Sequence, residues 1–213
     1  LDIKYKRPDS LRASASASFL GATAHLEGSW KPKKESYRAF RYLVGARYKT
    51  TQNLLGSLDV KGEYVPNFTD IQAYLTYDLS RDWQIGAIGN FNRSTYTFQP
   101  QSLARAFGLI DYALQLRTNF EGQEVDDFTQ AMGGLSLTFL PDRDHNPLYH
   151  KFLASAYTSQ ENERFDILGY YILGELDENL GSDNFGEITN ILGSGTQHNW
   201  VRNYLNAEVR NIE

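Results

Sequence analysis

Hydrophobic and polar residues alternate with a period of two along much of the chain. Between Leu11 and Phe19, leucine, alanine and phenylalanine occupy every second position, with arginine and serine between them. This period places the two kinds of residue on opposite faces of a β-strand. The phase of the alternation changes after Gly21, so the sequence predicts a tight turn at Phe19–Ala22 that joins two strands.

The same alternation recurs in six further segments. They are Phe40–Tyr48, Ile71–Leu79, Trp83–Phe91, Ala131–Phe139, Leu148–Ala156 and Leu205–Val209. Together with the first two, this predicts about eight strands, most of them near the length of a tilted strand that crosses a membrane. No long amphipathic helix and no linker interrupts the series. The pattern therefore predicts an all-β, antiparallel meander.

The predicted connections are of two kinds, and they alternate along the chain. Short ones are Ser29–Ser36, Ser80–Asp82 and Pro141–Pro147, and long ones are Thr50–Asn67, Gln99–Asp127 and roughly Ser159–Arg202. In a meander this alternation places all short turns at one end and all long loops at the other. That asymmetry is typical of an outer-membrane β-barrel.

Alternation does not by itself show which face meets water, and two interpretations stand. A soluble β-sandwich buries its apolar faces, whereas a membrane barrel turns them to lipid. Trp30 and Trp83 lie beside short turns, where an aromatic girdle meets the membrane interface. The apolar faces also hold many alanines and glycines, which supply little volume for a packed core. We therefore expect a transmembrane barrel, with a soluble all-β domain as the alternative.

Composition excludes several classes of protein. Of 213 residues, 14% are aromatic, which argues against disorder, and the net charge of -5 argues against a nucleic-acid partner. The chain has no cysteine, and hence no disulfide or thiolate site. No apolar run is long enough for a helix that spans a membrane. The chain starts at Leu1 and stops at Glu213 inside predicted strands, so we expect it to be a fragment of a larger protein.

Several motifs carry a family resemblance that covers nearly the whole chain. The run "LDIKYKRPDSLRASASASFLGATAHLEGSW" resembles the junction of plug and barrel in TonB-dependent outer-membrane receptors of the Bacteroidota type. "YLVGARYKT" and "PNFTDIQAYLTYDLSRDWQIGAIGNFNRS" resemble the strand and the hairpin that follow it. "FEGQEVDDF" and "RNYLNAEVRNIE" resemble later parts of the same group.

The resemblance implies a barrel of about 22 strands whose lumen is closed by an N-terminal plug. Residues 1–9 would be the last strand of the plug, and residues 10–213 the N-terminal portion of the barrel. The implied function is to bind a ligand at the outer loops and to import it by energy-coupled plug movement. The implied location is the bacterial outer membrane, and the implied partners are its lipid, the plug, a TonB-type energy transducer and a surface lipoprotein. The substrate and the residues that bind it stay unknown.

A structural or assembly role in a larger outer-membrane complex is the alternative within this family. Deletion of the energy transducer separates the two roles, because import requires it and scaffolding does not. A soluble β-sandwich that binds ligands is the third interpretation, and it fails if the protein partitions with the outer membrane.

No motif predicts catalysis, a cofactor or a metal site. The histidines do not show the H-E-x-x-H spacing of a zinc site, and no serine stands in a G-x-S-x-G motif. The four histidines are His25, His145, His150 and His198. We therefore expect a protein that is not an enzyme.

Two acidic stretches are the strongest candidates for a cation site. They hold Glu121, Glu124, Asp126 and Asp127, and Glu175, Asp177, Glu178, Asp183 and Glu187. Calcium prefers several oxygen ligands from a flexible loop, but Gly181 does not fit the EF-hand order. Solvated outer loops and a calcium site both stay open.

Two further sets of residues are candidates for binding. Charges on the polar faces, which would pair with plug carboxylates or contact substrate, are Arg12, Arg41, Arg47, Glu208 and Arg210. Aromatic residues on the predicted long loops, which would stack on sugar or peptide or pack the loops, are Tyr64, Phe68, Tyr96, Phe98, Tyr112, Phe120, Tyr170 and Tyr171.

Overall fold

The protein is an antiparallel β-sheet in every part that the structure describes. The structure, a computed structural model, describes residues 5–33, 37–51, 64–109, 112–141 and 150–212. These residues form nine strands and no helix, which confirms the all-β prediction. Among them there is no helical segment with the length and hydropathy needed to span a membrane.

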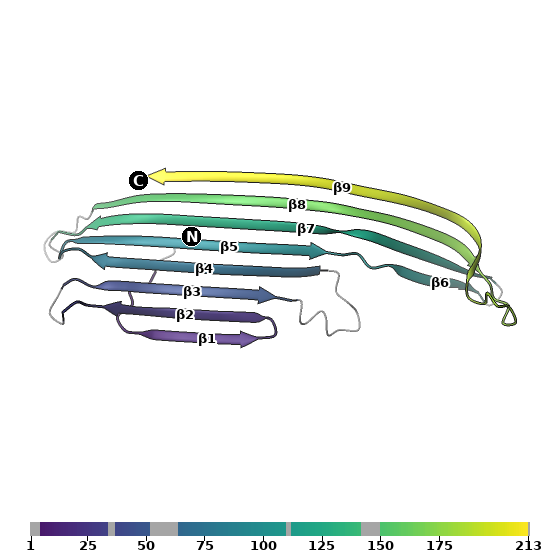
Figure 1. Cartoon of the computed structure of the whole chain (residues 1–213), viewed down its shortest axis with the longest axis horizontal. Coiled ribbons are helices and arrows are strands. Elements are labelled where there is room, and N and C mark those ends of the chain that lie inside the picture. The colour runs from purple at the N-terminus through teal and green to yellow at the C-terminus, as the bar shows by residue number, and fades with distance from the viewer. Residues whose placement is uncertain (1–4, 34–36, 52–63, 110–111, 142–149, 213) are drawn as a thin grey trace. The chain divides into compact units, whose positions relative to one another are not determined.

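The strands follow one another in the sheet as they do in the sequence (Figure 1). They are β1 (Arg12–Ser18), β2 (Gly21–Trp30), β3 (Phe40–Thr50), β4 (Tyr64–Asp78), β5 (Trp83–Phe98), β6 (Leu103–Leu109), β7 (Tyr112–Phe139), β8 (His150–Leu176) and β9 (Ile188–Ile212). The order is β1-β2-β3-β4-β5-β7-β8-β9, and β6 pairs with β7 off this path. β1 and β9 therefore form the two edges, and the meander prediction is confirmed.

The chain divides into two compact units. Unit 1 holds Leu1–Thr95, Asp127–Asn162 and Tyr204–Glu213, and unit 2 holds Tyr96–Asp126 and Glu163–Asn203. Strands β5, β7, β8 and β9 contribute residues to both units.

Two of the three predicted long loops are wrong. Most of residues 99–127 lies in β6 and in the first part of β7, and most of residues 159–202 lies in β8 and β9. These segments carry polar residues on both faces, so they lack the one-sided alternation that marked the other strands. Of the third predicted loop, residues 52–63 lie outside the described part, and β4 begins at Tyr64.

The register confirms the predicted faces of the first strands. Ala13 pairs with Leu26, Leu26 with Val44, and Val44 with Ala73, so one row of apolar residues crosses β1 to β4. The predicted turn between β1 and β2 is also confirmed. Gly21 has a φ of 136°, and a Cβ there would collide with the backbone oxygen of Tyr48. Glycine is therefore required at this close approach of two strands.

The apolar face has the same length in strands of very different lengths. It covers Ala22–Trp30 in β2, Phe40–Tyr48 in β3, Trp83–Phe91 in β5 and Ala131–Phe139 in β7, nine residues in each case. β2 has 10 residues in all, whereas β7 has 28. On the same side of β7, the two positions that precede Ala131 hold the polar residues Thr129 and Asp127. We call these four segments, with the residues of β1 and β4 paired to them, the apolar band.

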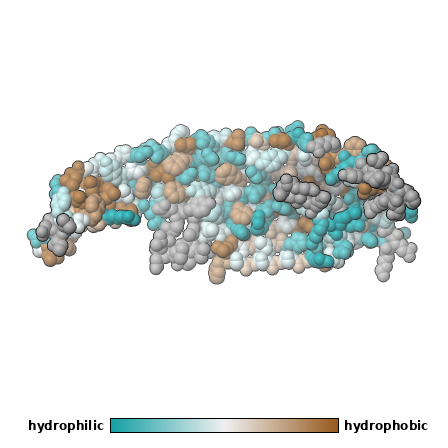
Figure 2. All heavy atoms as spheres, turned by 180° about the vertical axis from the view of Figure 1, so that it is seen from behind, coloured by the Kyte–Doolittle hydropathy of each residue, from teal (hydrophilic) through white to brown (hydrophobic). Residues whose placement is uncertain are grey.

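The apolar band is exposed rather than packed against a second layer. Among the described residues, Ala39 and Ile167 are the buried hydrophobic ones. Leu26 is 44% exposed and Leu135 is 59% exposed, and both lie in the band. Figure 2 shows hydrophobic residues at the surface of one face, next to hydrophilic ones. The described residues therefore form a single layer without a hydrophobic core of their own.

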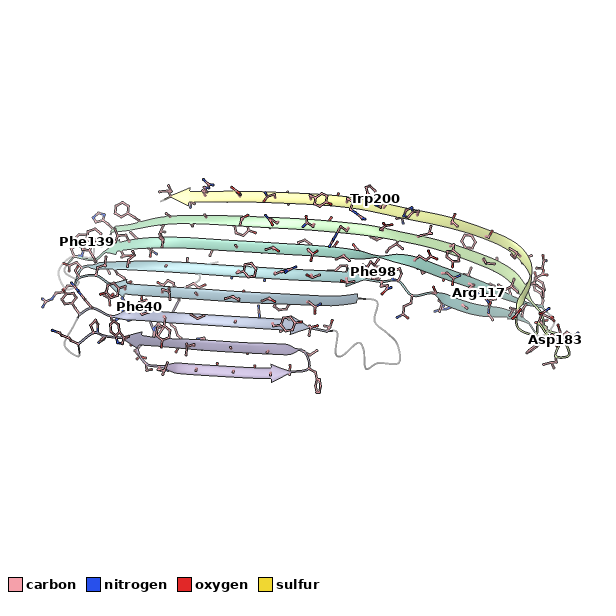
Figure 3. All side chains as sticks on the ribbon, in the orientation of Figure 1. Phe40, Phe98, Arg117, Phe139, Asp183 and Trp200 are labelled. Atoms are coloured by element: carbon pink, nitrogen blue, oxygen red, sulfur yellow. The ribbon has the colours of Figure 1, made fainter. Side chains whose placement is uncertain are left out.

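Aromatic side chains gather at the end of the band next to the short connections. Trp30 pairs with Phe40, and Phe40 pairs with Tyr77. The rings of Trp83 and Phe139 lie 4.7 Å apart between centroids, which places these two residues on one face. Figure 3 shows Phe40 and Phe139 near the ends of their strands. The predicted place of Trp30 and Trp83 beside short connections is confirmed.

Candidate functional site

Residues Tyr5–Ser10 cross the polar face of the sheet and contact the strands β1, β2 and β4. We call them the N-terminal segment. They contain no strand, and residues 1–4 lie outside the described part, so the predicted plug strand at residues 1–9 is untested. The ring of Tyr5 stacks on that of Tyr74 in β4, with centroids 4.9 Å apart and planes 20° apart. The hydroxyl of Ser29 in β2 donates a hydrogen bond of 2.7 Å to the carbonyl oxygen of Asp9.

Glu27 in β2 is the buried anchor for this segment. The residue is 2% exposed, and its Oε2 lies 2.5 Å from Nζ of Lys6. Nε of Arg12 lies 3.9 Å from Oε1, and Nε2 of His25 lies 3.3 Å from Oε2. A buried carboxylate destabilises the fold unless cations or donors surround it. Lys6 is the closest of these cations, so the charge of Glu27 holds the N-terminal segment on the sheet.

Asp78, at the end of β4, is the second anchor. Nη1 of Arg41 and Nε2 of Gln84 each lie 2.5 Å from its carboxylate oxygens. Nη2 of Arg7 adds an ion pair at 3.7 Å. All these side chains line a cavity of about 360 Å³ between the N-terminal segment and the end of β4. The segment is thus held by two of its cations on two carboxylates of the sheet, by the ion pair of Asp9 with Arg12, by one stacked ring pair and by one hydrogen bond.

The predicted polar-face charges are paired, but mostly within the sheet. Arg12 lies 3.9 Å from Asp9, which belongs to the N-terminal segment. Arg47 pairs with Asp70 at 3.2 Å, and Arg210 pairs with Glu208 at 3.6 Å. Arg41 pairs with Asp78, as described above. In addition, Lys6 and Arg7 of the N-terminal segment meet carboxylates of the sheet. The pairing of the polar-face charges with plug carboxylates stays a prediction.

The acidic stretches do not form a cation site in the described residues. No group of three or more histidine, aspartate or glutamate side chains there could hold a metal ion. The first stretch lies in β7, where burial, and then the charges of Asp126 and Glu163, raise the pKa of Glu124. In the second stretch, Asp177 accepts hydrogen bonds from the hydroxyl of Ser182 and the backbone amide of Asn179. This carboxylate therefore closes the turn between β8 and β9.

The histidines lie apart, and each described one has a different contact. His25 faces Glu27, the ring of His150 stacks near that of Phe139 at 6.4 Å, and His198 contacts Asp166. His145 lies outside the described residues.

Asp166 in β8 contacts two potential cations of β9. Its Oδ1 lies 2.9 Å from Nε2 of His198, and its Oδ2 lies 3.5 Å from Nη2 of Arg202. The hydrogen bond with His198, and then the charges of His198 and Arg202, hold the pKa of Asp166 below its ordinary value of 3.8. A lowered carboxylate pKa stabilises the folded state at neutral pH, and that contribution is lost as the pH falls through the folded pKa.

Removing His198 is expected to raise the pKa of Asp166 towards 3.8, because the first cause of its shift is gone. The contribution of this carboxylate to stability at neutral pH would then shrink, because that contribution depends on the difference between the folded and the unfolded pKa. A carboxyl carbon NMR titration of His198→Ala measures this. Asp177 is the internal control, since the hydroxyl of Ser182 lowers its pKa. An unchanged Asp166 titration, or an equal change at Asp177, would contradict the assignment.

The predicted aromatic candidates have separate environments. The ring of Phe68 lies 5.0 Å from the guanidinium of Arg47. The hydroxyl of Tyr112 donates a hydrogen bond to Glu175, which raises the pKa of Tyr112. Tyr96 and Phe98 lie in β5, and the side chain of Tyr64 is outside the described part. Phe120, Tyr170 and Tyr171 line one groove.

Sequence reasoning missed the residues that fix the N-terminal segment, above all Lys6, Glu27 and Asp78. The available signal was that Glu27 and Asp78 occupy polar-face positions of strands rich in small or apolar residues.

Comparison of the chain with protein-family models, with characterised proteins and with solved structures finds no match in any of the three.

Proposed function

We propose that this chain forms part of the barrel wall of a TonB-dependent outer-membrane receptor of the Bacteroidota type. The receptor binds a ligand on its outer side and imports it by energy-coupled movement of its N-terminal plug. One observation carries the proposal: the apolar band keeps a length of nine residues, whatever the length of the strand.

A constant apolar length is the mark of a slab of constant thickness. Nine residues of antiparallel strand span about 30 Å. Strands of membrane barrels tilt by about 35–45°, which reduces this to about 21–25 Å along the membrane normal. The lipid-facing band of such barrels is about 25 Å tall. In a packed sandwich the apolar face instead follows the extent of the second sheet, which the described residues do not contain.

The exposure of the band supports a lipid-facing role. Large apolar side chains such as Trp30, 60% exposed, and Leu135, 59% exposed, would be unfavourable in water as part of one continuous face. Lipid covers such a face without complementary packing, so the many alanines and glycines of the band are sufficient there. The aromatic residues beside the short connections fit the interfacial girdle of a barrel.

The N-terminal segment supports the receptor part of the proposal. It lies on the polar face, where the plug of such a receptor meets the wall. Its contacts are few, and the side chain of Lys6 is 56% exposed although its partner Glu27 is buried. A segment held in this way can leave the sheet without unfolding it, as energy-coupled movement requires.

Quenching by lipid-attached nitroxide tests the carrying observation. The chain has no native cysteine, so single cysteines can carry a fluorophore. In the intact protein in vesicles, labels at Ala46→Cys and Ala73→Cys are expected to be quenched by nitroxide placed in the acyl chains. A label at Gln72→Cys, on the polar face, is expected to be protected.

Thr129→Cys is the control for the limit of the band. It lies on the same side of β7 as the band but beyond Ala131, so its label is expected to escape the mid-chain quencher. Equal quenching at all positions, or protection of Ala46 and Ala73, would refute a lipid-facing band and with it the receptor proposal.

A further inference from the structure

Two aromatic rings lie flat against the sheet of unit 2, each over a glycine of the next strand. A Cβ placed on Gly169 in β8 would lie 3.1 Å from Cε1 of Phe120 in β7. A Cβ placed on Gly195 in β9 would lie 2.6 Å from Cε1 of Tyr171 in β8. Side chains at these two positions would tilt the rings away from the backbone. The glycines therefore set the orientation of both rings.

The two rings belong to one open groove of about 450 Å³. Phe120 is 38% exposed and Tyr171 is 46% exposed, so each ring presents a free face. The groove is lined by Thr118, Phe120, Gly169, Tyr170, Tyr171, Gly195, Thr196 and Gln197. Among these residues there is no carboxylate, ammonium or guanidinium group. Hydroxyls and one amide supply the polar contacts at the rim.

We propose that this groove binds a neutral saccharide. A pyranose ring has an apolar face of C–H groups, which stacks on an aromatic ring, and an outer rim of hydroxyls. The hydroxyl of Thr196, and the carbonyl oxygen and remaining N–H of the Gln197 amide, can accept from and donate to such hydroxyls. The hydroxyl of Thr118 donates to the carbonyl oxygen of Leu103, so it can only accept. Two rings on diagonal positions of neighbouring strands lie roughly 7–8 Å apart, which offers places for two sugar units of one chain.

The absence of charge in the lining separates a neutral saccharide from charged ligands. A carboxylate-rich metal chelate or a phosphorylated ligand would lose water there without gaining a charged partner. A neutral sugar exchanges hydroxyl–water contacts for contacts with threonine and glutamine, and its C–H face covers the rings.

The inference deepens the proposed receptor function and rests on it only for the fate of the bound sugar. Binding itself is measured in detergent solution, where neither a lipid bilayer nor import is needed. A failure to bind saccharide would therefore leave the lipid-quenching result unaffected, and the two proposals can fail separately.

Saturation-transfer NMR on the intact protein tests the groove, with cellohexaose, maltohexaose and xylohexaose as probes. Saturation of aromatic protons is expected to reach the C–H protons of at least one of these sugars. Phe120→Ala and Tyr171→Ala are each expected to weaken its binding about tenfold or more, as the loss of one stacking ring does elsewhere. Gly195→Ala is expected to weaken it as well, because the new methyl group displaces the ring of Tyr171.

Two variants keep the test sharp if the alanine variants fold poorly. Tyr171→Trp retains a flat ring and is expected to retain binding. Trp200→Ala removes an exposed ring of β9 (Figure 3). Trp200 lies on the opposite face from the groove, because it is an odd number of residues from Gly195 along the strand. This variant is expected to change the affinity for saccharide less than twofold. The proposal is overturned if no probe binds, or if Trp200→Ala weakens binding as much as Tyr171→Ala.

Discussion

Lys6→Met is expected to raise the rate of chymotryptic cleavage after Tyr5 by roughly 30-fold. The carboxylate of Glu27 is buried, and Lys6 is the cation nearest to it. A buried ion pair that loses one partner is destabilised by about 3–5 kcal/mol. Because Arg12 and His25 remain within 3.9 Å, we expect about 2 kcal/mol, or roughly 30-fold, in favour of the released segment. Cleavage follows this opening when the segment recloses faster than the protease cuts.

Glu27→Gln is expected to have a smaller effect on the same cleavage, although it breaks the same ion pair. The side chains of Lys6 and Arg12 are 56% and 65% exposed, so water solvates their charges when the carboxylate is gone. The variant leaves no buried charge, and a loss of about 1 kcal/mol is expected, or roughly fivefold in rate. Lys6→Met therefore has the larger effect because it leaves the buried carboxylate of Glu27 unpaired, whereas Glu27→Gln leaves only exposed cations unpaired.

The double variant Lys6→Met/Glu27→Gln separates this pair from general weakening of the segment. It is expected to release the segment less than Lys6→Met alone, because the uncompensated carboxylate is absent. Lys31→Met removes an exposed cation outside the N-terminal segment and is the charge-matched control. If the effects of the two single substitutions add in the double variant, Glu27 does not anchor the segment through Lys6.

The faces of the first five strands could be read from the sequence because each has one apolar side. In β3, the even positions from Phe40 to Tyr48 are apolar or aromatic, and they alternate with residues such as Arg41 and Arg47. The register places the two sets on the faces that this pattern predicts. A shift by one residue would move every apolar side chain to the polar face, so the pattern specifies the register strongly.

The parts of β7 and β8 that were predicted as loops could not be read in this way. The stretches "TNFEGQEVDD" in β7 and "SQENERFD" in β8 carry polar residues at both odd and even positions. Their backbone groups pair in the ladder, but neither face has a continuous apolar side that would reveal a period of two. Without that signal, charged and glycine-containing segments were predicted as loops.

The site depended on contacts that no local pattern specifies. Tyr5 stacks on Tyr74 and Lys6 meets Glu27, and both pairs join residues far apart in the sequence. The sequence identified Arg12 and Arg41 as polar-face charges but not the carboxylates that pair with them. The groove of unit 2 was missed for a related reason, since Gly169 and Gly195 acquire meaning only when the neighbouring strand places a ring over each of them.

Val44→Arg is expected to lower the free energy of unfolding in phospholipid vesicles by about 2–4 kcal/mol, the effect of a cation at the bilayer midplane of a barrel. Val44 is the central residue of the band in β3 and pairs with Leu26 and Ala73, so no polar group of these neighbours can receive the guanidinium. Urea titration of the intact, vesicle-inserted protein measures the difference.

Two further arginine substitutions turn this experiment into a measurement of depth and of sidedness. Tyr48→Arg lies at the edge of the same band and is expected to lose only about 0–1 kcal/mol, because the guanidinium reaches the interface. Gln72→Arg lies on the polar face, where the amide of Gln72 is 3.4 Å from both carboxylate oxygens of Asp70, and is expected to be nearly neutral. A gradient from Val44 to Tyr48, without an effect at Gln72, is what a lipid slab around one face requires. Equal losses at Val44 and Tyr48 would instead indicate a packed protein interface, whose cost follows side-chain contacts and not distance from a membrane centre.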